Sequence, residues 1–169
     1  MTPDSAPVRV GVAGHIDLTP TTERLVADAL RVELRRISDR PVHGVTCLAA
    51  GTDQIFARVV LAAGGTYEVV LPALDYRDTI GPAGRAAFDE LLARATEIIH
   101  TGYHSSGTAA YLAANQEMLK RVQWLVAVWD GVPGCHAAST DRTLGSARHR
   151  GIPTTVIWPA AARRRSQGD

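Results

Sequence analysis

Near the start of the chain stands Val8-Arg9-Val10-Gly11-Val12-Ala13, followed by the loop Gly14-His15-Ile16-Asp17 and then by Thr19-Pro20. A short apolar run rich in valine predicts a β-strand that is buried on both faces. The glycine after it indicates a tight turn, and Thr19-Pro20 indicates a helix that begins with an N-cap and a first-turn proline. The stretch therefore predicts a strand, a loop and a helix, which together are the repeating unit of an α/β fold.

The same unit recurs along the rest of the chain. Runs such as Leu125-Val126-Ala127-Val128 show little alternation between apolar and polar residues, which favours a parallel sheet covered on both sides. The expected strands cover 8–13, 42–49, 67–71, 97–100, 125–129 and 154–158. The expected helices cover 19–37, 52–63, 88–95, 111–122 and 141–149.

We predict a three-layer, Rossmann-like α/β domain with a parallel sheet of about six strands and helices on both faces. The expected strand order is 3-2-1-4-5-6, in which the chain reverses direction between strands 1 and 4. A ligand is expected at the carboxyl ends of those strands. The domain covers 8–160, between a disordered leader over 1–7 and a flexible basic tail over 161–169, which contains Arg163-Arg164-Arg165.

Composition limits the class of protein. The chain has 169 residues, of which 46% are hydrophobic and 21% charged, as is usual for one globular domain. The net charge of +1 does not by itself indicate a nucleic-acid or membrane partner, and neither is expected. No apolar run reaches the ~18 residues of a membrane helix, and residues 1–7 lack the features of a signal peptide. Cys47 and Cys135 form no CxxC motif, so a cytoplasmic location is expected.

Four strand-to-helix loops are expected at the same edge of the sheet: 13–17, 49–53, 102–108 and 130–141. In the predicted order the first, third and fourth are neighbours, and the second lies one strand away. Glycine lets a ligand approach the backbone, and the free N–H groups of a helix start suit a phosphate. The same residue types also serve ordinary turns and caps, so a purely structural role is the alternative. The candidate ligand-binding residues are Gly14, His15, Gly51, Thr52, Asp53, His104, Ser105, Ser106, Asp130, Gly131, Ser139 and Thr140.

Other catalytic and metal motifs are missing from the sequence. His100 and His104 are separated by Gly102 and have no third ligand at metal spacing, so no metal site is expected. The only lysine, Lys120, follows no glycine loop, which excludes a Walker A motif. No GxSxG elbow occurs either.

Taken together, several segments resemble the SLOG superfamily of Rossmann-like proteins. This superfamily includes the cytokinin-activating phosphoribohydrolases (LOG, or "possible lysine decarboxylase") and the DNA-processing protein A family. The likeness is to a small stand-alone type common in actinobacteria and extends from Val8 to Pro159. The matching segments are Gly11 to His15, Cys47 to Gln54, Leu71-Pro72, Ala127 to Gly131 and Gly151 to Pro153. The resemblance implies a nucleotide or nucleotide-derived ligand, such as an ADP-ribose-like molecule or a nucleoside monophosphate, and no required cofactor.

Two departures from that family bear on activity. Relatives carry a glycine pair before the threonine of the fourth loop, where this chain has Ala138-Ser139. The PGGxGTxxE signature of the enzymatic branch is also missing. We therefore expect a protein that binds or senses the ligand without turnover, and we expect a homo-oligomer.

Two alternatives stay open at this stage. One is a nucleotide hydrolase or N-ribosyl-transfer enzyme, with Asp53, Asp130 or Glu117 as the acid or base and His15 or His104 assisting. Glu117 also suits an ordinary surface pair with Lys120. The other alternative is a scaffold domain whose site has decayed.

Overall fold

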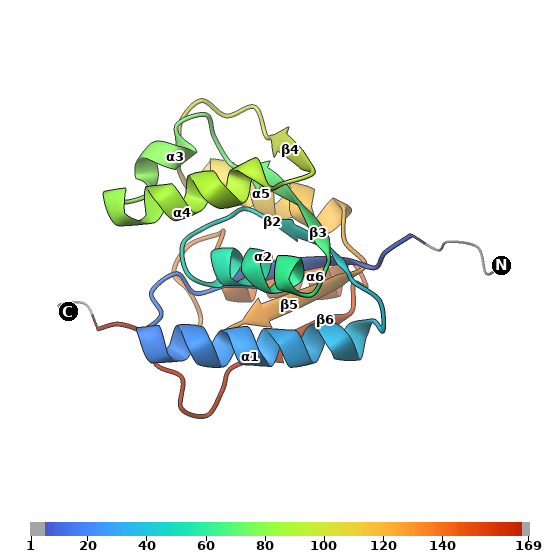
Figure 1. The fold of residues 1–169 in the computed structure, drawn as a ribbon. Helices are drawn as coiled ribbons and strands as arrows, with labels where there is room; N and C mark the ends of the chain where they lie inside the picture. Colours follow the sequence, from blue (N-terminus) through green and yellow to red (C-terminus); the bar gives the residue numbers. More distant parts are fainter. Residues whose placement is uncertain (1–5, 167–169) are drawn as a thin grey trace.

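Six parallel strands form the centre of the computed structural model, which describes residues 6–166 (Figure 1). The strands are β1 (Arg9–Gly14), β2 (His43–Thr46), β3 (Thr66–Leu71), β4 (Glu97–His100), β5 (Trp124–Val128) and β6 (Thr154–Ile157). The helices are α1 (Pro20–Ile37), α2 (Thr52–Ala62), α3 (Tyr76–Thr79), α4 (Pro82–Ala93), α5 (Thr108–Lys120) and α6 (Thr140–His149). The α/β class, the parallel sheet and the helices on both faces are therefore confirmed. Residues 1–5 of the predicted leader lie outside the described part of the chain.

Helix α1 begins where its sequence predicts. The Thr19 hydroxyl accepts a hydrogen bond from the Thr22 backbone N–H at 3.2 Å, and Pro20 occupies the first turn. This N-cap satisfies one of the donors that a helix start leaves free. Val26 and Leu30 follow at helical spacing and are fully buried against the sheet.

The strand order β4-β3-β2-β1-β5-β6 corrects one part of the prediction. The fourth strand lies at the edge of the sheet beside β3, not between the first and fifth strands. Its residue Ile98 is 42% exposed, as an edge position allows, whereas a central strand would bury it. Strands β1 and β5 pair directly and in parallel. Strands β2 to β4 are added on one side of β1, and β5 and β6 on the other, so the order of strand addition reverses between β1 and β5. The switch point lies at the carboxyl ends of these two strands.

Each face of the sheet buries its own apolar cluster. Helices α1, α2 and α4 cover one face, where Phe56, Tyr67 and Phe88 are almost fully buried. Helices α5 and α6 cover the other face, around Met118 and Leu125. None of the helices within residues 6–166 combines the length and apolar composition that a bilayer span requires.

The chain beyond β6 returns to the first loop. The Arg165 backbone N–H donates to the Asp17 carbonyl at 2.7 Å, and the Arg163 N–H donates to the Thr22 hydroxyl at 2.7 Å. Leu18 and Arg164 form an isolated antiparallel bridge. In contrast to the predicted flexible tail, the described part of this segment is therefore docked against the start of α1.

Candidate functional site

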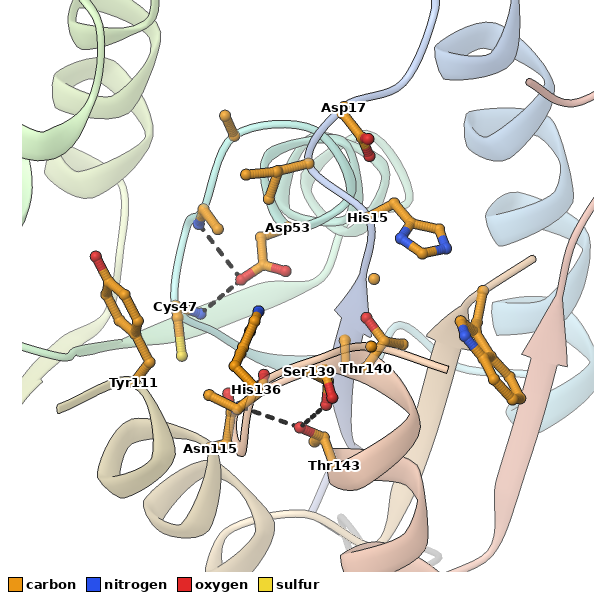
Figure 2. Close-up of a pocket in the computed structure, with 18 of the residues that line it drawn as sticks. His15, Asp17, Cys47, Asp53, Tyr111, Asn115, His136, Ser139, Thr140 and Thr143 are labelled. Atoms are coloured by element: carbon orange, nitrogen blue, oxygen red, sulfur yellow. Dashed lines mark hydrogen bonds between the residues drawn. The ribbon is translucent and has the colours of Figure 1, made fainter. Parts of the chain in front are cut away.

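A cavity of about 690 Å³ lies at the carboxyl edge of the sheet, where the chain reverses between β1 and β5. The loops after β1, β2 and β5 line it, together with one side of α5 and part of the segment after β3 (Figure 2). Its volume falls within the range of ~300–1,000 Å³ that is typical of small-molecule sites. Position and size together make it the candidate site of this protein.

The loop after β1 is held in place by the start of α2. The Thr52 hydroxyl and backbone N–H both donate to the His15 carbonyl, at 2.9 and 3.2 Å. A Cβ added at Gly14 would lie 2.5 Å from the Thr52 Oγ1, so only glycine fits there. Gly51 has a φ of 74°, which favours glycine, and like Thr52 it lies outside the cavity lining. Of the predicted binding residues here, Gly14 and His15 line the cavity, whereas Gly51 and Thr52 support the loop.

His15 and Asp130 form a pair between the loops after β1 and β5. The His15 Nε2 lies 3.0 Å from the Asp130 Oδ1, and the His15 ring packs edge-on against Trp158. Burial acts to raise the pKa of Asp130, but the Val132 amide and His15 outweigh it and hold the pKa below its ordinary value. Asp130 is therefore ionised at neutral pH. Asp130 and Gly131 lie outside the lining, so the structure does not place them directly in the site.

Asp53 is the buried carboxylate of the cavity, with 7% of its surface exposed. Its Oδ2 accepts hydrogen bonds from the backbone N–H groups of Cys47 and Ala49, at 3.1 and 3.4 Å. Burial raises the pKa of Asp53 to about 6, although these amides and the Thr46 hydroxyl oppose the shift. The other oxygen takes neither backbone bond and points away from the two amides (Figure 2). Burial, followed by the charge of Asp53, also raises the pKa of the Cys47 thiol.

The start of α6 contains a carboxylate of its own. The Ser139 hydroxyl donates to the Asp141 Oδ1 at 2.6 Å, and the Gly134 backbone N–H donates to the same oxygen at 3.0 Å. The Ser139 hydroxyl is the main cause that lowers the pKa of Asp141, and the amides of Gly134, Asp141 and Arg142 add to it. Ser139 and Thr140, which are predicted ligand-binding residues, line the cavity.

The third predicted loop does not belong to this site. His104, Ser105 and Ser106 are outside the cavity lining, because β4 lies at the edge of the sheet. The Ser106 N–H and hydroxyl both donate to the Asp75 carboxylate at 2.7 Å, which ties this loop to the segment after β3. Glu117 is also outside the lining and pairs with Lys120 and Arg121.

Several lining residues were not among the predicted site residues. Tyr111 and Asn115 face the cavity from α5 (Figure 2), and the Asn115 amide donates to the Ala138 carbonyl at 3.2 Å and to Thr143 at 3.0 Å. The sequence could have indicated Asn115, because it is a polar residue on the otherwise apolar face of the predicted helix. His136 comes from the loop after β5 and Arg164 from the docked C-terminal segment.

Arg164 is the only lysine or arginine in the lining, among the residues that the structure describes. Its guanidinium lies 2.9 Å from Asp17 and 3.4 Å from Asp130. Hydrogen bonding to Asp17 is the main cause that raises the pKa of Arg164. Over the same described range, no three His, Cys, Asp or Glu side chains gather as a metal ion would require.

No family model and no curated protein matches the chain. Solved structures do match it. DNA processing protein A from Streptococcus pneumoniae aligns over 91% of this chain and 51% of its own, with 14% identity and a TM-score of 0.67. The protein of that name from Helicobacter pylori aligns over 92% and 67%, with 19% identity and a TM-score of 0.67. A Moco carrier protein from Chlamydomonas reinhardtii aligns over 89% and 76%, with 20% identity and a TM-score of 0.54.

At these identities the comparisons establish the fold. The expected Rossmann-like fold is therefore confirmed, and DNA processing protein A, one of the families named for the resemblance, is among the structures that share it. The chain spans about half the length of the Streptococcus protein.

One prediction about partners has to be corrected. The net charge of +1 does not by itself indicate a nucleic-acid partner, and none is expected from the sequence. The matching structure from Helicobacter pylori is described by its single-stranded DNA binding mode, and this finding overturns the expectation of no nucleic-acid partner.

Proposed function

We propose that this protein binds a nucleotide or a nucleotide-derived small molecule in the cavity at the β1–β5 reversal. The observation that carries the proposal is the convergence of three strand-to-helix loops on one hollow of about 690 Å³. Ligands of open α/β sheets bind at such a reversal, outside the carboxyl ends of the strands. Because the hollow is not filled by its own side chains, binding is favoured over a scaffold with a decayed site.

The lining suits the parts of a nucleotide. Tyr111 and Trp129 offer aromatic surface for a base, while Ser139, Thr140 and Asp53 offer polar groups for a sugar or phosphate. The single-stranded DNA binding of the Helicobacter relative is consistent with nucleotide chemistry on this fold.

A thermal-shift panel tests the proposal. It contains the common ribonucleosides, their 5′-mono- and diphosphates, ADP-ribose and a short single-stranded oligonucleotide. A ligand at 100 times its Kd stabilises the folded state by about 2.7 kcal/mol, which raises the Tm of a chain of this size by roughly 5–11 °C. No shift with any member of the panel would refute the proposal.

A matched pair of variants locates the binding. Ala138→Trp places a large ring at a residue of the lining and should abolish the shift. Ala86→Trp makes the same change at an exposed position on α4 and should leave the shift intact.

One observation favours a second candidate, a nucleotide hydrolase. Asp53 faces the cavity with a pKa of about 6, which suits a general acid near neutral pH. Cleavage of an N-glycosidic bond can use such a carboxyl group. Chromatography of nucleoside monophosphates after long incubation, with Asp53→Asn as the control, tests it, and unchanged substrates would eliminate it.

A further inference from the structure

Two helices that start at the cavity carry an aspartate at the same position. Helix α2 begins with Thr52-Asp53 and helix α6 begins with Thr140-Asp141. A helix start normally offers its free N–H groups and positive dipole end to a phosphate. Here the chain places one of its own carboxylates at each of the two starts.

The start of α6 is already occupied. Asp141 Oδ1 accepts hydrogen bonds from the Ser139 hydroxyl at 2.6 Å and from the Gly134 N–H at 3.0 Å. The amides of Asp141 and Arg142 also interact with this carboxylate. The donors that would hold a phosphate oxygen are thus engaged by an internal anion.

The start of α2 presents a second carboxylate to the same cavity. Asp53 is 7% exposed and lines the hollow. Its Oδ2 is held by the Cys47 and Ala49 amides, and the Thr46 hydroxyl also bonds the carboxylate. The other oxygen takes neither backbone bond (Figure 2). A carboxylate oxygen accepts hydrogen bonds only, so it selects a ligand group that donates, such as a hydroxyl or an amine.

The balance of charge in the lining points the same way. Asp17, Asp53 and Asp141 line the cavity, against Arg164 as the only described lysine or arginine there. Arg164 is partly exposed and already paired with Asp17 at 2.9 Å. A phosphate placed between Asp53 and Asp141 would meet like charge in a site of reduced dielectric constant.

We propose that the cavity binds the uncharged, donor-bearing part of its ligand, the ribose hydroxyls of a nucleoside, against Asp53, and that Asp141 keeps any phosphate away from α6. The inference rests on the proposed function and specifies its ligand class. Ribonucleosides bind as tightly as their 5′-phosphates, and Asp141 acts as a built-in competitor of phosphate at α6.

The first experiment uses inorganic phosphate as the probe and needs no knowledge of the natural ligand. Millimolar phosphate should leave the Tm of the unaltered protein unchanged, relative to chloride at equal ionic strength. Asp141→Ala removes the internal anion and should gain a phosphate-dependent rise in Tm. Asp28→Ala removes the same charge from an exposed site on α1 and should gain none. Phosphate binding by the unaltered protein, or equal responses of the two variants, would overturn the inference.

A second variant covers the event that Asp141→Ala does not fold. Asp141→Asn keeps an acceptor for Ser139 and Gly134 but removes the charge. It should bind nucleoside 5′-monophosphates more tightly than the unaltered protein does, while its affinity for the nucleosides stays the same. A monophosphate affinity that does not rise in this variant contradicts the role of Asp141.

Calorimetry with matched ligands tests the hydroxyl contact. Each ribonucleoside that binds is compared with its 2′-deoxy and 5′-phosphate counterparts. Loss of a hydrogen bond to a charged group should weaken binding by about tenfold or more, whereas the phosphate should change affinity by less than about threefold. A monophosphate that binds far more tightly than its nucleoside overturns the inference but leaves nucleotide binding intact. If no nucleoside or nucleotide binds, the proposed function itself fails, and the phosphate experiment still decides the role of Asp141.

Discussion

The charge on buried Asp53 should make the protein less stable at neutral pH than an uncharged side chain would. The pKa of Asp53 is raised from 3.8 to about 6, so the folded state binds this proton more tightly than the unfolded chain does. The stability from that proton is fully present below pH 3.8 and is lost as the pH rises through 6. A difference of roughly 2 pKa units corresponds to about 3 kcal/mol.

The substitution Asp53→Asn isolates this effect. The asparagine oxygen can accept the same two bonds from Cys47 and Ala49 but carries no charge. The free energy of unfolding of the variant should therefore rise relative to that of the unaltered protein by about 2–3 kcal/mol between pH 4 and pH 8. Most of this rise should fall between pH 4 and pH 6.5.

Urea unfolding, followed by the fluorescence of the three tryptophans, measures this difference at each pH. Asp141→Asn is the matched control, because the pKa of Asp141 is lowered and its charge stabilises the fold. That variant should be less stable than the unaltered protein by a constant amount above about pH 5, and the difference should shrink only as the pH falls below 3.8. If the free energy of unfolding of Asp53→Asn, relative to that of the unaltered protein, stays constant or falls as the pH rises, then Asp53 is not a buried carboxylate with a raised pKa.

Two other predictions follow from packing around the site. Gly14→Ala should destabilise the fold by about 1–3 kcal/mol in the same urea assay, because its Cβ would lie 2.5 Å from the Thr52 hydroxyl. Gly145→Ala, where a Cβ meets nothing within 4 Å on helix α6, should cause no loss and gain up to ~1 kcal/mol. Iodoacetamide at pH 7.5 should label the exposed Cys135 and spare Cys47, whose burial hides the thiol and raises its pKa. Mass spectrometry of the native protein checks this, and rapid labelling of Cys47 would contradict its burial.

Most of the fold could be predicted from neighbouring residues in the sequence. The exception is the position of one strand in the sheet, which depends on contacts between distant segments. The helix start at Thr19-Pro20 depends on neighbouring residues and could be read directly. The position of Glu97–His100 could not, because a four-residue apolar strand has the same pattern at the edge of a sheet as in its middle. The predicted order placed His104 and its neighbours beside the switch point, whereas the structure places them outside the cavity.

The residues of the site also differ in whether local sequence could predict them. Five of the predicted residues could be identified because they lie in strand-to-helix loops, and all five line the cavity: Gly14, His15, Asp53, Ser139 and Thr140. Arg164 could not be found in this way. It reaches the rim only because the chain end docks through backbone bonds, such as that of the Arg165 N–H to the Asp17 carbonyl, and backbone bonds carry no signature in composition.

The fold and the side chains answer different questions about the ligand. The parallel sheet fixes where a ligand can sit, since the reversal between β1 and β5 opens a hollow there whatever the loops contain. The likeness to the solved structures, at 14–20% identity, shows the fold alone. The loops decide what the hollow accepts, because the helix starts that would attract an anion on this fold instead hold Asp53 and Asp141. Since a carboxylate in that place selects donors over phosphates, two proteins with the same sheet and the same hollow can bind opposite ends of related molecules.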